Sequence, residues 1–171
     1  MNIFAIEGNE ETGVIDWYES GRSQDNLRTV KMVLETTQLL SSAMHLNGMQ
    51  GCYKLTHANH PSTLWTKESS ANWQNLFVHG MALLQEYEER FGRVHKCRDL
   101  MLGMEKNVDF SKFPTSEPTP LKMAMPDEFR VEGNPVKSYR DYFSSKEKIR
   151  YPADRVPMWF LERRKIPFDI V

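Results

Sequence analysis

The chain has 171 residues and a mass of 20.0 kDa, which is the size of one domain that can bury a core without disulfides. Its 40% hydrophobic and 26% charged residues exclude a collagen-like, coiled-coil or wholly disordered chain. A net charge of −1 and a pI near 6.5 do not indicate a strongly electrostatic nucleic-acid binder.

Nothing in the sequence indicates a membrane or secreted protein. No apolar run approaches the roughly 18 residues that a spanning helix needs. The first residues lack the basic and apolar regions of a signal peptide. The two cysteines, Cys52 and Cys97, cannot form a disulfide framework, and nothing near them completes a zinc site. We therefore expect a cytoplasmic protein with no membrane partner.

The first half of the chain has the apolar periodicity of helices. One helix is predicted from about Gln24 to Leu46, and a second is predicted to begin at Pro61 and to keep one inward stripe as far as Phe91. Gly92 is well placed to end that helix, and Val94 to Met104 predicts a third, shorter one. The inward face of the first helix is predicted to consist of Val30, Val33, Leu34, Thr37, Leu40, Ser41 and Met44.

The second half begins with a segment without periodicity. Three prolines and the loss of apolar spacing predict a long irregular loop over residues 105–120, with a turn or short helix start at 125–128. Asn134-Pro135 has the pattern of an N-cap and first-turn proline, which predicts a helix ending before Pro152, and residues 157–164 add a last short turn. We therefore expect an all-α, compact helical bundle formed as a single domain over residues 1–171.

Charge is unevenly distributed along the chain. The first 35 residues carry seven acidic against three basic residues, a net −4, whereas residues 137–165 carry nine basic against four acidic, a net +5. Aromatic residues are interleaved with the basic ones: Tyr139, Tyr142, Phe143, Tyr151, Trp159 and Phe160. Such a segment suits a nucleic-acid surface. It equally suits an amphipathic helix with a solvated basic face and aromatics packed on the core, which is the interpretation we favour.

A few polar residues allow either a structural or a functional interpretation. Lys31 and Glu35 share a helix face, either as a solvated pair or as a carboxylate beside a cation in a cleft. His57 and His60 could bind zinc, but a catalytic zinc usually needs a third protein ligand, so we favour a capping or packing role for His60. Because phosphate-binding, dinucleotide and acyl-transfer motifs are also absent from the sequence, we expect neither a metal nor a cofactor.

Several short motifs resemble a group of small proteins common in tailed-phage genomes, which would place the protein in the cytoplasm of a bacterial host. Those motifs are residues 1–4, 26–35, 59–61, 82–92 and 125–129. Their pattern is in turn distantly similar to the pyrimidine-dimer DNA glycosylases of the phage endonuclease V type. In that family a glutamate on the first long helix follows a histidine by seven residues, and here Glu35 follows Arg28 by seven. Asn26 and Arg28 stand where the family has aspartate and histidine.

The resemblance implies chemistry at the chain N-terminus. An α-amine ordinarily has a pKa of about 7.7–8.0, against about 10.4 for lysine, so an N-terminal amine is well suited to attack deoxyribose C1′. Met1, which we expect to be retained before Asn2, would supply that amine (Asn2 would if it is removed), and Glu35 would move protons. The residues predicted to bind the substrate are Arg28, Lys31, His57, His60, Asn72, Trp73, Tyr139, Arg140, Tyr142 and Lys146. The expected partner is DNA or a nucleotide.

Two other classes of function suit the same residues. A non-catalytic protein could bind or sequester a nucleotide through stacking rings and cations, with no need of the N-terminal amine. An interaction protein could instead inhibit a host factor and bind neither DNA nor nucleotides.

Overall fold

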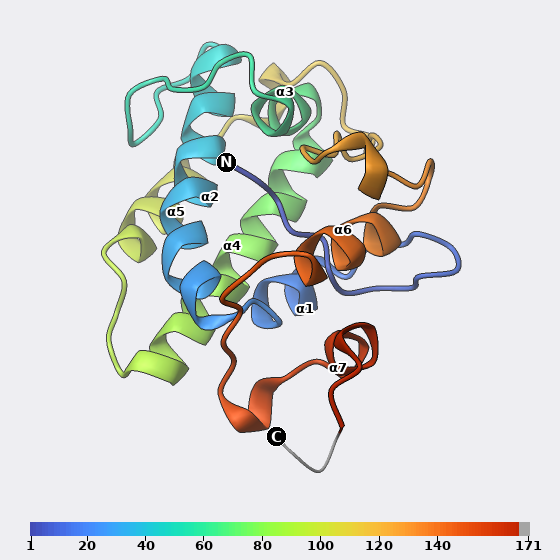
Figure 1. Cartoon of the computed structure of the whole chain (residues 1–171). Coiled ribbons are helices and arrows are strands. Elements are labelled where there is room, and N and C mark those ends of the chain that lie inside the picture. The colour runs from blue at the N-terminus through green and yellow to red at the C-terminus, as the bar shows by residue number, and fades with distance from the viewer. Residues whose placement is uncertain (168–171) are drawn as a thin grey trace.

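The computed structural model describes residues 1–167, which form helices and irregular connections (Figure 1). Two isolated β-bridges occur in this part of the chain, and no strand. The α-helices are α1 (Trp17–Arg22), α2 (Asn26–Leu46), α3 (Pro61–Glu68), α4 (Ser70–Phe91), α5 (Cys97–Asn107), α6 (Pro135–Ser144) and α7 (Met158–Arg164). Short 3-10 helices lie in the connections: η1 (Phe110–Lys112), η2 (Asp127–Phe129) and η3 (Ala153–Arg155). The predicted all-α class is confirmed.

The N-terminal segment runs through the middle of the molecule, between the long helices α2 and α4 on one side and α6 on the other (Figure 1). Its residues Ile3 to Ile6 are at most 5% exposed, although they belong to no helix. They join one hydrophobic cluster that extends from Ile3 to Phe160. Because the segment is enclosed by the core, the position of the chain's first residue is determined by packing.

Helix α2 forms where it was predicted, but its buried face differs. Asp25 caps the helix by accepting a hydrogen bond from the backbone N–H of Arg28. Val30 and Leu34 were predicted to point inward, and this was wrong: they are 43% and 40% exposed. The other predicted residues of that face are buried, and so is Thr36, which was not predicted and whose methyl group lies beside Gly80 of α4.

The predicted stripe from Pro61 to Phe91 is divided into two helices. Proline opens α3 and Gly92 closes α4 with a positive φ of 62°, as expected. The chain is extended at Ser69, whose hydroxyl accepts hydrogen bonds from the first turn of α4. The next backbone N–H, that of Ser70, donates to the Thr115 carbonyl at 3.0 Å. The irregular segment after α5 thus packs against the break and supplies the missing backbone partner.

Other boundaries follow from local caps. Helix α5 begins at Cys97, not at Val94, and the Cys97 N–H donates to His95 Nδ1. The helix continues to Asn107, so the loop predicted over residues 105–120 begins three residues later and contains η1. Asn134 caps α6 as predicted, and α7 forms within the predicted last turn. Helix α1 was not predicted, since its six residues are too few to show a period. None of the helices within residues 1–167 is long and apolar enough to cross a membrane.

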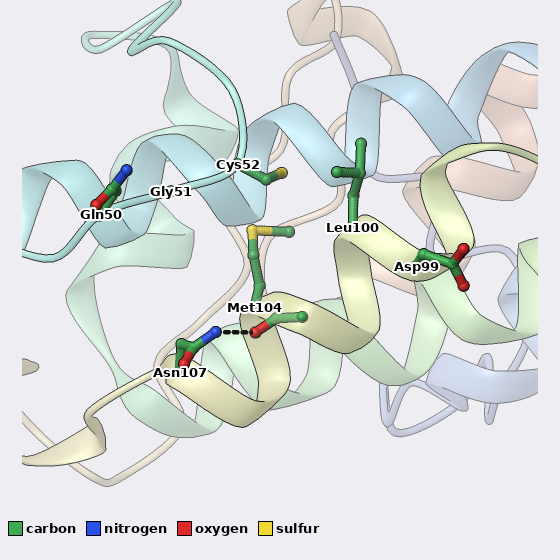
Figure 2. A pocket seen from close by; sticks show the side chains of 8 residues that line it. Gln50, Gly51, Cys52, Asp99, Leu100, Met104 and Asn107 are labelled. Atoms are coloured by element: carbon green, nitrogen blue, oxygen red, sulfur yellow. Dashed lines mark hydrogen bonds between the residues drawn. The ribbon is translucent and has the colours of Figure 1, made fainter.

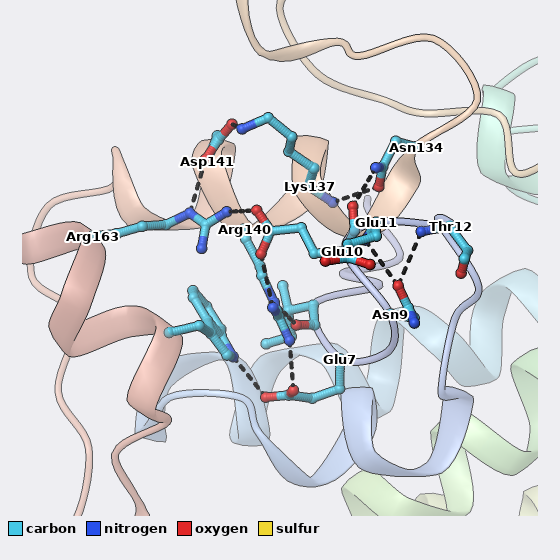
Figure 3. A network of polar contacts seen from close by, with 12 residues as sticks. Glu7, Asn9, Glu10, Glu11, Thr12, Asn134, Lys137, Arg140, Asp141 and Arg163 are labelled. Atoms are coloured by element: carbon cyan, nitrogen blue, oxygen red, sulfur yellow. Dashed lines mark hydrogen bonds and ion pairs between the residues drawn. The ribbon is translucent and has the colours of Figure 1, made fainter.

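The basic C-terminal part folds against the acidic N-terminal part (Figure 3). Arg140 donates to Glu7 at 3.0 Å and to Glu10 at 2.9 Å, and Arg163 pairs with both Glu10 and Asp141. The pKa of Glu10 lies below its usual value because its hydrogen bonds and charge interactions with the two arginines outweigh the opposing effect of burial. The aromatic residues of this part are packed inward as favoured, but many of its basic residues are paired with carboxylates and not simply solvated.

The buried histidine at the contact of α1 and α4 predicts a pH-dependent stability. His79 donates its Nδ1 hydrogen to the Trp17 carbonyl at 3.2 Å, and burial lowers its pKa to about 4. The unfolded chain binds a proton near pH 6.5 and the folded one does not, so stability must fall as pH drops from 6.5 toward 4. We expect a loss of about 2 kcal/mol between pH 7 and 5 from this residue. Urea unfolding of wild type and His79→Gln at both pH values checks it, because equal pH dependence in the two proteins would contradict the assignment.

Candidate functional site

The chain N-terminus meets a carboxylate of α2. The Met1 nitrogen lies 3.8 Å from Glu35 Oε2, and Lys31 Nζ lies 3.3 Å from Glu35 Oε1. The Met1 side chain is 4% exposed and that of Glu35 15%, whereas Lys31 is 63% exposed. One carboxylate is thus shared by two amines, that of Met1, whose side chain is buried, and that of the exposed Lys31.

The amine is held in place by the residue after it. Asn2 donates through Nδ2 to the Ala124 carbonyl at 2.8 Å, and its Oδ1 accepts from the Tyr139 hydroxyl at 2.8 Å. Asn2 and Tyr139 are both buried, and burial raises the pKa of the Tyr139 hydroxyl well above its usual range, so it stays a donor. Since Ile3 onward is packed in the core, the amine can move little relative to Glu35.

A small cavity of about 210 Å³ opens at the amine. It is lined by Met1, Asn2, Phe4, Leu27, Arg28, Lys31, Met32, Glu35, Tyr142 and Lys146. Three side-chain cations and the amine therefore surround a single carboxylate. Such a site favours an anionic or polar ligand, because charges in a partly desolvated cavity interact more strongly than in water.

Aromatic rings orient two of the cations. The guanidinium of Arg28 lies 4.9 Å from the Phe143 ring centroid and pairs with Asp25 at 2.8 Å. The ammonium of Lys146 lies 3.8 Å from the ring centroid of Tyr142. Both contacts are within the range of cation–π interactions, and the charge of Arg28 is in addition matched by the Asp25 carboxylate.

The two predicted histidines lie at the start of α3. His60 is its N-cap, with Nδ1 accepting from the Ser62 N–H, which agrees with the favoured capping role. Burial, followed by the positive charges of the N-terminus and His57, lowers the pKa of His60, and nearby Glu35 acts in the opposite direction. His57 is exposed and contacts the Thr56 hydroxyl. Within residues 1–167 no group of three potential ligands could hold a metal ion.

Six predicted binding residues do not line the cavity, the two histidines and four others. Asn72 is buried and bonded to Trp65 and Thr119, and Trp73 is a core residue that donates to the Leu40 carbonyl. Tyr139 supports Asn2, and Arg140 is occupied by its acidic partners. Those predicted residues that the structure brings together at the cavity are Met1, Arg28, Lys31, Glu35, Tyr142 and Lys146.

Four lining residues were not selected from the sequence: Asn2, Phe4, Leu27 and Met32. The apolar run that begins at Ile3 was an available signal, because a short apolar segment at a chain end can pack through a core. Leu27 carried no such signal, since it lies outside the apolar face expected for its helix.

A larger cavity of about 520 Å³ lies between the loop after α2 and α5 (Figure 2). Cys52 and Met104 face it, while Asn107 Nδ2 is bonded to the Gly103 carbonyl. Burial raises the pKa of the Cys52 thiol, and Asp99 is the one charged side chain in the lining. This cavity lacks the amine and the cations that line the cavity at Met1.

Comparisons with known proteins give no family. No protein-family model matches the chain, and neither a curated protein nor a solved structure matches it significantly. The functional interpretation therefore depends on the geometry at Met1 and on the motif resemblance.

Proposed function

We propose that this protein is a DNA glycosylase/AP lyase-like enzyme that attacks deoxyribose C1′ at a damaged pyrimidine or an abasic site with the Met1 amine. The observation that supports this is the 3.8 Å approach of the Met1 nitrogen to Glu35 within a cation-lined cavity. A fixed amine beside a carboxylate is the pair that imine formation and elimination need.

The proposed reaction proceeds through an imine between the Met1 amine and the sugar. At a damaged pyrimidine the amine bonds to C1′ as the C1′–N1 bond breaks, the base leaves with that electron pair, and the sugar ring then opens to an imine. At an abasic site the amine adds to C1′ of the open sugar aldehyde, and loss of water gives the same imine. Glu35 then takes a proton from C2′, the C3′–O bond breaks, and the 3′ phosphate leaves with its electron pair. Water releases the unsaturated aldehyde and restores the amine. Arg28 and Lys146 would bind the phosphates on either side of the sugar.

The size of the cavity supports a sugar over a whole nucleotide as the enclosed group. Sites that enclose small organic ligands usually have volumes of about 300–1,000 Å³. The cavity at Met1, about 210 Å³, is smaller and has room for a deoxyribose with its base outside. Nucleotide sequestration remains the alternative, and it would not require the amine.

Borohydride trapping tests the proposal. Wild-type protein is incubated with duplex DNA carrying an abasic site or ultraviolet-induced dimers, and borohydride reduces any imine to a stable adduct. We expect a covalent protein–DNA adduct that disappears when the α-amine is acetylated. Intact-mass measurement beforehand establishes that Met1 carries a free amine.

The two lysines at the cavity provide matched controls. Lys31→Arg and Lys146→Arg keep the positive charge but remove the primary amine, so both should still be trapped. An adduct that survives acetylation and is lost in Lys31→Arg would assign the nucleophile to Lys31 instead. No adduct from wild type with either DNA would contradict the proposal.

A further inference from the structure

Helix α2 exposes an apolar stripe on the solvent side of the cavity. Leu27, Val30 and Leu34 are 58%, 43% and 40% exposed. At 3.6 residues per turn they occupy a sector of about 60° on the helix. The neighbouring sector carries Lys31 and Glu35, and Leu27 itself lines the cavity. Leu27 therefore joins the stripe to the rim of the candidate site, and Val30 and Leu34 continue the stripe away from the cavity.

Basic residues border the same rim. Lys31 stands between the stripe and Glu35, with 63% of its side chain exposed. At the start of α2, the Asn26 N–H donates to the Arg150 carbonyl at 2.9 Å, so the backbone of the segment that carries the exposed residues Glu147, Lys148 and Arg150 lies at that end of the helix. Apolar side chains flanked by cations match DNA that has lost a base, because the gap exposes base faces between phosphates.

We propose that the stripe docks on DNA at the abasic site, with Leu27 entering the space left by the missing base. This inference depends on the proposed function, since it is the Met1 amine that would hold the adjoining sugar. An apolar wedge between base steps lowers the cost of exposing the sugar to the cavity. Leu27 is thus a positioning residue that gives preference for base-free sites and takes no part in the chemistry.

Binding to an unreactive duplex tests this separately from catalysis. The probe is a duplex with a central tetrahydrofuran abasic analogue, which cannot form an imine, and 2-aminopurine opposite it. We expect wild type to prefer this duplex over the intact one and to raise the 2-aminopurine fluorescence by unstacking it. Leu27→Ser should lower the preference about tenfold, the scale of one lost base contact, and abolish the fluorescence rise. Val78→Ser, on α4 and 42% exposed, is the matched control and should behave as wild type.

The outcomes separate the two proposals. Glu35→Gln should keep the preference for the analogue, because it alters only proton transfer. If wild type gives no adduct with abasic DNA but its preference for the analogue is lost in Leu27→Ser, the proposed chemistry is overturned and the docking is supported. An unchanged preference in Leu27→Ser overturns the docking. So does a change in the protein's solution mass in that variant with no effect on DNA, since the stripe would then join copies of the chain.

Discussion

Replacing Glu86 by alanine is expected to lower the free energy of unfolding by about 3–5 kcal/mol, the range found when one partner of a buried ion pair is removed. The Glu86 side chain on α4 is fully buried. It accepts from Arg90 at 2.6 Å, Arg155 at 2.8 Å and Arg22 at 2.9 Å. The alanine variant would leave Arg90, 3% exposed, without its carboxylate. Urea unfolding followed by circular dichroism measures the loss.

Glu89, one turn further along α4, is the control. It binds two of the same arginines, and these bonds lower its pKa to about 2, but its side chain is 36% exposed. Glu89→Ala should therefore cost at most about 1 kcal/mol, as is usual for solvent-exposed pairs. Equal losses in the two variants would show that the buried position of Glu86 has no special effect. Glu86→Gln, which keeps the shape, separates the loss of charge from the loss of packing.

Helix ends that depend on residues close by in the chain could be predicted from the sequence. Proline at the first position of α3, Gly92 after α4 and Asn134 before α6 act within one turn of the residues that they cap. The break at Ser69 could not be predicted in this way, because it is completed by Thr115, a residue 46 positions later. The exposure of Leu34 likewise depends on which face of α2 meets α4.

The candidate site was likewise predicted only in part. The motif resemblance placed Glu35 beside the N-terminus, and the structure has the two groups 3.8 Å apart. Asn72 and Trp73 are of the polar and aromatic residue types that are common in binding sites. Inside the protein, however, the Asn72 side chain donates a hydrogen bond to Thr119 and the Trp73 side chain donates one to the Leu40 carbonyl. Composition could not reveal that distinction, since hydrogen-bond partners distant in sequence decide it.

The acidic and basic parts of the chain pair with each other, which the sequence alone could not show. An acidic N-terminal half would repel the phosphates of a ligand at Met1. Glu7 and Glu10 are instead neutralised by Arg140 and Arg163 on the side facing α6 and α7 (Figure 3). At the cavity Arg28 pairs with Asp25 and Lys31 with Glu35, while Lys146 lies over the Tyr142 ring, so the local potential there is set by these groups and not by Glu7 and Glu10.

Replacing Glu35 by glutamine should abolish most strand cleavage at abasic DNA, with a rate at least about 100-fold lower than wild type. Glutamine keeps the size of the side chain but cannot accept the C2′ proton. The fold should be unaffected, because the two partners of Glu35 are the Met1 amine and the exposed Lys31. Gel separation measures cleaved DNA in a reaction without borohydride, and trapped DNA in a parallel reaction with it.

Glu88→Gln is the matched control, since the same substitution on α4 breaks only a surface pair with Arg98. It should cleave as wild type does, and both variants should unfold at the wild-type urea midpoint. If Glu35→Gln is trapped by borohydride yet leaves the strand uncut, the carboxylate acts in elimination, after the amine has bonded to C1′. Cleavage at the wild-type rate in Glu35→Gln would remove the carboxylate from the mechanism.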